Sequence, residues 1–220
     1  ELGARVGGYG SFNYNWGAGV VWFGRRSRLL TGYEVRENDV LIGLQEKGFR
    51  SNGLSMLRKI MKNVHGEEWH NEMYEGKSLA ELALYPSRIY CAAVAEMFGG
   101  FDREPKAIVH GVAHITGGGL PGKLGRVLKP SGLGATITDS FDPSILMKYC
   151  QEKGNVSDKE AYKTWNMGQG MVVISPEAES VISVAQAHGI EAKVIGNVTK
   201  NPGIRIISKG IYSCGREISW

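Results

Sequence analysis

Apolar and polar positions along this chain follow two periodicities, one typical of buried strands and the other typical of amphipathic helices. Residues 40–44 form an apolar run, which predicts a buried strand. The next segment repeats apolar side chains every three or four positions, with basic side chains on the other faces. This spacing predicts a helix capped by Ser51 or Asn52. The apolar positions of the helix are Leu54, Leu57, Ile60, Met61 and Val64.

The same two patterns alternate through the rest of the chain. Further strands are predicted at residues 19–23, 107–112, 135–138, 170–175, 192–195 and 204–208. Further helices are predicted at residues 87–98, 120–128 and 143–153. A short helix is predicted to follow a capping box at Ser157–Glu160, and another helix is predicted between Pro176 and Gly189. Such alternation predicts an α/β or α+β fold in which helices pack on a sheet.

Length and composition limit the classes of protein that this chain can represent. Its 220 residues suffice for one large domain, or for one domain and part of another, and its 42% hydrophobic and 22% charged residues are ordinary for a globular protein. The net charge of +4 is spread along the chain, which suits an anionic metabolite and argues against a nucleic-acid partner. No apolar run approaches the length of a membrane span and no secretory signal is visible, so no membrane partner is expected.

The cysteines point to the compartment in which the protein works. Cys91, Cys150 and Cys214 are odd in number and lack the spacing of a Cys-x-x-Cys site. Disulfide frameworks use even numbers of cysteines in oxidising compartments. We therefore expect free thiols and a cytoplasmic location.

The most informative stretch is a run of three consecutive glycines, Gly117, Gly118 and Gly119, between a predicted strand and a predicted helix. Glycines leave backbone N–H groups uncovered, and a helix N-terminus attracts anions, so this loop predicts a phosphate site. An ordinary glycine-rich turn is the alternative interpretation. Residues 117–123 also spell the start of a P-loop, but Leu124 stands where a P-loop needs Ser or Thr, which excludes that class.

Two other glycine-containing segments are candidates for ligand binding. Arg50, Ser51, Asn52 and Gly53 lie between a strand and a helix and offer a second anion cradle with its own guanidinium. The alternative is an ordinary helix cap with a solvated arginine. Residues 166–170 precede a strand and offer amide and backbone groups, for which a plain turn is again the alternative.

Two histidines and the absence of other patterns bear on catalysis. His110 and His114 are four residues apart and would share one face of a helix or strand. No glutamate follows His110 and no further ligand has suitable spacing, so no metal site is predicted. We interpret His114 as a polar wall of the phosphate site or as a structural histidine. No nucleophile arrangement can be assembled, so no catalytic residue is predicted.

Taken together and in order, these segments resemble those of a known family. The resemblance rests on residues 39–44, 50–55, 85–90, 111–120, 154–157, 164–171 and 194–196. They read DVLIGL, RSNGLS, YPSRIY, GVAHITGGGL, GNVS, TWNMGQGM and VIG. They are similar to segments of the C-terminal domain of the aminoimidazole ribonucleotide synthetases, also called phosphoribosylformylglycinamidine cyclo-ligases, and the resemblance covers roughly residues 17–208 in collinear order.

The resemblance implies a fold and a domain organisation. The fold would be a mixed β-sheet packed with helices. Residues 1–24 would be the remnant of an N-terminal domain that binds nucleotide and forms a homodimer, and residues 25–220 would be the C-terminal synthetase domain. The chain also opens at Glu1 without a methionine. We therefore expect it to be a fragment that is inactive alone.

The resemblance further implies a reaction and its site. ATP would drive ring closure of formylglycinamidine ribonucleotide to aminoimidazole ribonucleotide in purine biosynthesis, with ADP and phosphate released. ATP and Mg²⁺ would be held mostly by the N-terminal domain. The triple glycine would supply backbone donors to a phosphate, with His114 and Thr116 beside it. Asn166, Gly168 and Gly170 would line the same cleft.

Arg50 departs from the family pattern, because the family has His-Ser-Asn-Gly where this chain has Arg50 to Gly53. A permanently charged guanidinium binds phosphate but does not shuttle protons near neutral pH. Two other hypotheses therefore stay open. The chain could belong to a superfamily relative with another acceptor, or it could be a non-catalytic module that binds a phosphorylated ligand.

Overall fold

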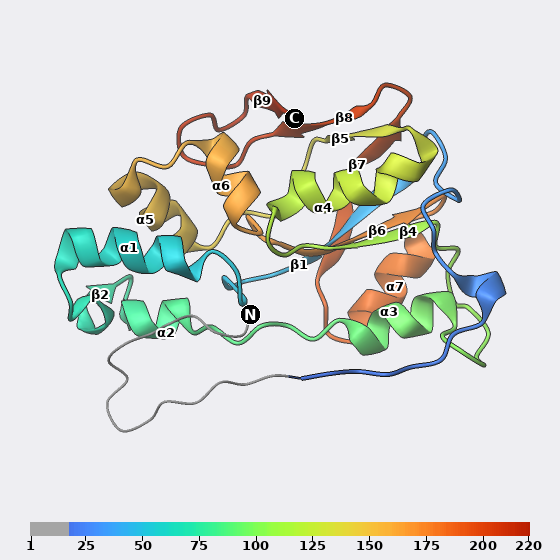
Figure 1. Cartoon of the computed structure of the whole chain (residues 1–220), viewed down its shortest axis with the longest axis horizontal. Helices are drawn as coiled ribbons and strands as arrows, with labels where there is room; N and C mark the ends of the chain where they lie inside the picture. The colour runs from blue at the N-terminus through green and yellow to red at the C-terminus, as the bar shows by residue number, and fades with distance from the viewer. Residues whose placement is uncertain (1–17) are drawn as a thin grey trace.

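A computed structural model of the chain describes residues 18–220, and its centre is a seven-stranded sheet (Figure 1). The strand order is β4-β6-β1-β7-β5-β8-β9, and all neighbours are antiparallel except β5 and β8. The prediction of a mixed sheet packed with helices is therefore confirmed. The strands are β1 (Val40–Gln45), β4 (Gly111–His114), β5 (Gly134–Ile137), β6 (Gln169–Ser175), β7 (Ala192–Thr199), β8 (Gly203–Ile207) and β9 (Glu217–Ser219).

Helices cover both faces of this sheet. Helices α1, α4, α5 and α6 contribute to the apolar core on one face, whereas α3 and α7 pack on the other (Figure 1). A small hairpin of β2 (Met73–Tyr74) and β3 (Lys77–Ser78) leads into α2. Within residues 18–220 no helix is long and apolar enough to cross a membrane. The helices are α1 (Leu54–His65), α2 (Leu79–Ala83), α3 (Cys91–Phe98), α4 (Gly119–Leu128), α5 (Ile145–Gly154), α6 (Asp158–Thr164) and α7 (Glu179–Ala187).

The central strands are apolar on both faces because both faces are covered. Leu41 of β1 packs in the core beneath α1 and α4, whereas its neighbour Ile42 packs in the core beneath α3 and α7. Val172 and Val173 of β6 divide in the same way. Successive side chains of a strand point to opposite faces, so a strand covered on both sides reads as a continuous apolar run.

The strand expected at residues 19–23 does not form. This segment has no strand geometry, and the side chains of Val20, Val21, Trp22 and Phe23 are between 69% and 92% exposed. A strand needs a neighbouring strand to pair with its backbone N–H and C=O groups. No strand in the described part of the chain pairs with this segment. Its apolar composition was therefore not sufficient to make it a strand.

Helix α3 begins at Cys91, four residues later than predicted. The backbone N–H of Arg88 donates to a carboxylate oxygen of Glu46 (3.2 Å), and the Arg88 guanidinium donates to the carbonyl of Gly189 (2.6 Å). The residues before α3 are therefore held in an extended conformation by long-range contacts that the local sequence does not reveal.

The hydroxyl of Ser175 shifts two other boundaries. It donates to the carbonyl of Ile108 (2.6 Å) and accepts from the backbone N–H of Glu177 (3.2 Å). These bonds engage the residues where β4 and α7 were predicted to begin. As a result β4 starts at Gly111 and α7 starts at Glu179.

The predicted capping box at the start of α6 is only half formed. The hydroxyl of Ser157 accepts from the backbone N–H of Glu160 (3.3 Å), as expected for an N-cap. The carboxylate of Glu160 instead accepts from the hydroxyl of Thr164 (3.1 Å). The cap therefore rests on the serine alone.

Asp158 fastens α6 to the C-terminal segment. Its buried carboxylate accepts from the side chains of Gln151 (2.8 Å) and Ser208 (2.6 Å) and from the backbone N–H groups of Tyr212 (3.1 Å) and Ser213 (2.8 Å). A buried carboxylate is tolerated when its oxygens are saturated with donors. This carboxylate therefore holds α6 in the position that the glycine loop requires.

We predict that Asp158→Asn lowers the free energy of unfolding by about 2–4 kcal/mol. The carboxylate now accepts hydrogen bonds from four donors, and the NH₂ group of an amide would place its own N–H groups against some of these donors. Urea denaturation followed by tryptophan fluorescence measures the change. Asp142→Asn alters an exposed carboxylate and serves as the control, with an effect below about 0.5 kcal/mol. Equal losses in the two variants would contradict the role of Asp158.

Candidate functional site

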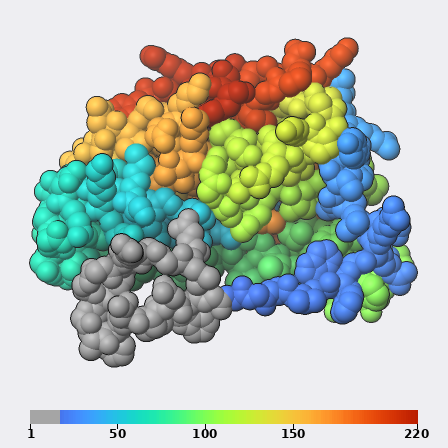
Figure 2. All heavy atoms as spheres, in the orientation of Figure 1, coloured from blue at the N-terminus to red at the C-terminus, as the bar shows by residue number. Residues whose placement is uncertain are grey.

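Antiparallel pairing brings the three predicted loops to one edge of the sheet. The C-terminal ends of β1 and β4 both lie beside the start of β6, because Leu44 and His114 are each paired with Met171. The segment after β1, the glycine loop after β4 and the loop before β6 therefore meet. Helices α1 and α4, which follow the first two loops, lie on the same face of the molecule, in cyan and yellow-green in Figure 2.

Arg50 connects these loops through its guanidinium. Nη1 donates to the carbonyl of Gly170 (3.1 Å), and Nη2 lies 2.7 Å from Nε2 of His114. Nε lies 3.7 Å from a carboxylate oxygen of Glu46, and the guanidinium stacks 5.3 Å from the ring centre of Tyr90. Residues that are distant in sequence thus converge on one permanent positive charge.

Glu46 is a site residue that sequence reasoning missed. Its side chain is 1% exposed, and one carboxylate oxygen accepts from the backbone N–H groups of Lys47 (2.9 Å) and Gly48 (3.3 Å). The other oxygen accepts from the N–H of Arg88 (3.2 Å) and lies 3.2 Å from the hydroxyl oxygen of Tyr90. A carboxylate directly after a buried strand and four residues before an arginine was the available signal.

Tyr90 packs against both Glu46 and Arg50. Its hydroxyl donates to the carbonyl of Gln45 (2.7 Å), and burial, followed by the charge of Glu46, raises the pKa of this phenol. Tyr90 therefore stays protonated and keeps its role as a donor. A Cβ on Gly170 would lie 1.9 Å from the Tyr90 hydroxyl oxygen, so packing alone requires a glycine there.

Packing also explains three of the other predicted glycines. A Cβ on Gly53 would lie 2.3 Å from Cδ1 of Trp165, and one on Gly119 would lie 1.8 Å from the carbonyl oxygen of Tyr162. At Gly168 the clash would be with the carbonyl oxygen of Asp142, at 2.4 Å. These glycines allow close approach of backbone segments and need no ligand to account for them.

Gly117 and Gly118 differ from the rest, because they are exposed and face open space. A Cβ on Gly118 would meet no atom within 4 Å, although its φ of +94° favours glycine. A Cβ on Gly117 would meet only the side-chain amide of Asn52, at 3.2 Å from Oδ1. The part of the triple glycine that a ligand can approach is therefore Gly117 and Gly118.

Two helix N-termini meet at this open space without side-chain caps. Gly53 is the N-cap of α1, so the prediction that Ser51 or Asn52 caps this helix was wrong. Gly118 is the N-cap of α4, and neither helix has a capping hydrogen bond from a side chain. The first N–H groups of a helix have no intrahelical acceptor and carry partial positive charge. Thr116 closes the turn, because its carbonyl accepts from the Gly119 N–H (2.8 Å).

Positive charge is concentrated around the open loop. Partial desolvation, followed by the charges of Arg50 and Lys123, lowers the pKa of His114 from its ordinary value of 6.5. Lys123 lies on the first turns of α4, and within residues 18–220 no carboxylate lies within 4 Å of its ammonium group. The loop therefore offers backbone donors together with a half-buried guanidinium and an ammonium group, which is a chemistry suited to phosphate.

The third predicted loop lies behind the site and not along its open side. Asn166 is 4% exposed, donates to the carbonyl of Gly48 (2.8 Å) and accepts from the N–H of Gly168 (2.9 Å). Gly168 and Gly170 are buried as well. These residues tie the start of β6 to the segment that follows β1 and support the carbonyl of Gly170 that Arg50 contacts.

The described residues do not supply a metal site. Within residues 18–220 no three side chains of His, Cys, Asp or Glu are grouped so that they could hold a metal ion. His110 pairs with Asp39 (2.8 Å from Nδ1 to Oδ2), whereas His114 contacts Arg50, so the two histidines do not act together.

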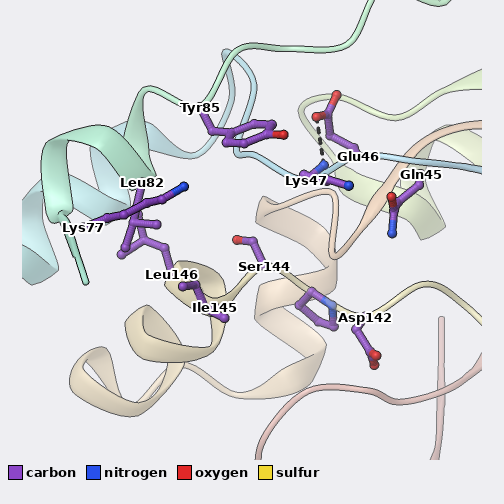
Figure 3. A pocket seen from close by; sticks show the side chains of 11 residues that line it. Gln45, Glu46, Lys47, Lys77, Leu82, Tyr85, Asp142, Ser144, Ile145 and Leu146 are labelled. Atoms are coloured by element: carbon purple, nitrogen blue, oxygen red, sulfur yellow. Dashed lines mark hydrogen bonds between the residues drawn. The ribbon is translucent and has the colours of Figure 1, made fainter. Parts of the chain in front are cut away.

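A separate cleft of about 340 Å³ lies between the end of β1 and the start of α5 (Figure 3). The side chains of Lys47, Lys77, Tyr85 and Ser144 are arranged around it. It shares Glu46 with the loop site but contains none of the residues predicted from sequence. The cleft and the loop site are therefore distinct surfaces that share the buried carboxylate of Glu46.

Comparison with known proteins agrees with this architecture. The profile of the family described as "AIR synthase related protein, C-terminal domain" matches residues 36–209. The chain belongs to this family.

Three curated relatives bear the name phosphoribosylformylglycinamidine cyclo-ligase, a ligase. The protein of Synechococcus elongatus is 34% identical over 94% of this chain and 60% of its own length. Those of Methanopyrus kandleri and Methanococcoides burtonii are 36% and 37% identical over 82% and 83% of this chain, and over 50% of their own lengths. This chain thus spans between half and three-fifths of the length of these relatives.

Solved structures share the fold at low identity. The HypE–HypF complex contains a chain that matches with a TM-score of 0.54 at 16% identity, over 86% of this chain and 53% of its own. Thiamine-monophosphate kinase from Stenotrophomonas maltophilia matches with a TM-score of 0.54 at 11% identity, over 86% of this chain and 55% of its own. These likenesses establish the fold alone.

We predict that neighbouring glycines of the loop respond differently to substitution. Gly119→Ala should lower the free energy of unfolding by roughly 3 kcal/mol or more, because its Cβ would overlap a backbone carbonyl. Gly118→Ala should cost only about 1 kcal/mol, the penalty of a left-handed backbone without a clash. Urea denaturation measures both values. Equal costs at the two positions would contradict the division between packed and open glycines.

Proposed function

We propose that this chain is the substrate- and phosphate-binding domain of an ATP-dependent cyclo-ligase of purine biosynthesis. The reaction would close the imidazole ring of formylglycinamidine ribonucleotide to give aminoimidazole ribonucleotide, with ADP and phosphate as the other products. Membership of the family and the names of the curated relatives support this assignment.

The observation that carries the proposal is the open loop at Gly117 and Gly118. Two uncapped helix N-termini face it, and Arg50 and Lys123 add two positive charges nearby. A ribonucleotide phosphate or a transferred phosphoryl group is the anion that such a combination binds. A plain turn would not need open space together with uncapped amides and the ammonium group of Lys123, which no carboxylate of residues 18–220 pairs.

The reaction requires the protein to position the reacting groups and to neutralise the negative charge of the transferred phosphoryl group. An amide oxygen is a poor leaving group, and its phosphorylation by ATP makes it a good one. Attack by the amidine nitrogen then forms the ring C–N bond, and phosphate departs with that oxygen. Backbone N–H groups and fixed cations held around the phosphoryl oxygens stabilise the charge that this step develops. Arg50, the Gly118 loop and Lys123 are proposed to supply part of that stabilisation.

The cofactors and the partner chain belong to the proposal as well. Mg²⁺ would need carboxylate ligands that are not grouped anywhere in residues 18–220. We therefore assign Mg²⁺, most contacts to ATP and the homodimer interface to the part of such an enzyme that corresponds to the remaining length of the relatives. This chain contributes the anion loop, by which we mean Gly117 to Gly119 at the N-terminus of α4.

A non-catalytic role is the second candidate, and Arg50 is the observation that favours it. The guanidinium is engaged with Gly170, His114 and Glu46 and cannot transfer protons near neutral pH. A module of this kind would bind the phosphorylated ligand without turning it over.

We predict that the complete enzyme, which includes the part that corresponds to the remaining length of the relatives, binds formylglycinamidine ribonucleotide and releases ADP and phosphate when Mg-ATP is added. Gly118→Ala should weaken binding at least tenfold, because its methyl group would occupy the space of the anion; tenfold corresponds to about 1.4 kcal/mol. Isothermal titration calorimetry measures binding, and a coupled assay of ADP release measures turnover.

Gly132→Ala is the matched control for this experiment. Gly132 also has a positive φ (+70°) and no atom within 4 Å of an added Cβ, but it lies at the far end of α4. Its substitution should leave binding unchanged. Binding without turnover would favour the non-catalytic module, and equal weakening by both variants, or no binding at all, would contradict the proposed site.

A further inference from the structure

The contact between Arg50 and His114 determines more than the position of the two side chains. Nη2 of Arg50 lies 2.7 Å from Nε2 of His114. A guanidinium has five N–H donors and no acceptor, and it keeps its proton at every pH at which proteins are folded. At this separation Nε2 of His114 must present a lone pair, because an N–H on Nε2 would point at the N–H of Arg50 Nη2. The histidine is therefore neutral, and its single ring proton resides on Nδ1.

The surroundings hold the guanidinium in this contact. Gly170 accepts from Nη1, and the buried carboxylate of Glu46 lies beside Nε. The ring of Tyr90 forms a flat surface under the guanidinium. Movement of Arg50 away from His114 would break these contacts together and would weaken the compensation of a buried carboxylate.

The charges around His114 oppose its protonation. Arg50 approaches it from the segment after β1, and Lys123 approaches from α4. The negative charge of Glu46 lies behind Arg50, where it pairs with the guanidinium. His110, which directly precedes β4, is paired with Asp39. Both charges that act directly on the ring are therefore positive, in agreement with the tautomer that the hydrogen bond requires.

We propose that Arg50 is a positioning residue that fixes His114 as the neutral Nδ1–H tautomer, so that His114 serves the anion loop as a hydrogen-bond donor and not as a proton acceptor. The assignment of the tautomer stands on the contact alone. The donor role rests on the proposed function, because it needs an anion such as phosphate or sulfate beside Gly118. Nε2, the ring nitrogen that could accept a proton from a substrate, is covered by Arg50.

Nitrogen-15 NMR of the histidine side chains in the purified protein tests this directly. The long-range correlations of His114, assigned by their loss in His114→Asn, should show Nδ1 protonated and Nε2 unprotonated at pH 7. The same state should persist to pH 6, below the ordinary histidine pKa of about 6.5. A protonated Nε2, or a doubly protonated ring at pH 7, would overturn the proposal.

Two variants separate the hydrogen bond from the general effect of positive charge. In Arg50→Gln a neutral amide can donate or accept, so the ring should become a mixture of tautomers and its pKa should rise toward 6.5. In Lys123→Gln the pKa should rise as well, but the Nδ1–H tautomer should remain because Arg50 is still present. Amide spectra that match the unchanged protein verify folding. An unaltered tautomer in Arg50→Gln would show that Arg50 does not set it.

Sulfate is the probe for the donor role. Its addition should shift the Nδ1 resonance of His114 and leave Nε2 unprotonated, whereas sodium chloride at equal ionic strength should not. A sulfate titration that moves neither the ring nor the Gly118 amide would overturn the donor role. Turnover of the ribonucleotide with a cationic His114 would reject this inference alone, and the expected tautomer without turnover would reject only the proposed reaction.

Discussion

The guanidinium of Arg50 is the group on which the site geometry depends, because it contacts residues at the ends of three strands at one edge of the sheet. It reaches the carbonyl at the start of β6, the histidine at the end of β4 and the carboxylate that follows β1. The backbone of Arg50 itself has a φ of +61°, which is uncommon for a residue with a side chain. Such a conformation costs about 1–2 kcal/mol and persists where surrounding contacts over-determine it. Here those contacts are a salt bridge, two hydrogen bonds and a stacked ring.

With Arg50 fixed, the surrounding glycines divide into two groups. Those whose Cβ would strike backbone or aromatic atoms let the loops approach one another. Gly117 and Gly118 instead leave the N-terminus of α4 open beside that of α1. A motif that reads as one glycine-rich loop thus combines close packing at Gly119 with an open surface at Gly117 and Gly118. The buried Tyr90 and Glu46 supply the rigid support that a charged site of this kind needs.

Much of the fold could be predicted from the sequence, because β1, β6, α1 and α4 are defined by local apolar periodicity. The triple glycine and the Arg50 segment were likewise visible as loops after strands. Features that depend on distant partners were not. The predicted strand at residues 19–23 lacks a neighbour, and α3 starts late because Glu46 binds the backbone of Arg88. Strand β9 was missed because its three residues carry no apolar run and exist only through pairing with β8.

The same distinction applies to the site. Sequence spacing predicted three candidate loops, but it could not show that Asn166 faces inward to Gly48 or that Glu46 is buried against Arg50. Those facts follow from the register of β1 against β6, which places the end of one strand beside the start of the other. Antiparallel register is a long-range property that no local pattern contains.

The proposed function requires an anion to bind at the N-terminus of α4, beside Arg50. The most direct measurement is the crystal structure of the protein soaked in selenate, with the selenium located by its anomalous scattering. We expect a selenium peak within hydrogen-bonding reach of the backbone N–H groups at Gly118 and of the Arg50 guanidinium. A peak confined to the cleft between Lys47 and Lys77, with none at the glycine loop, would contradict it.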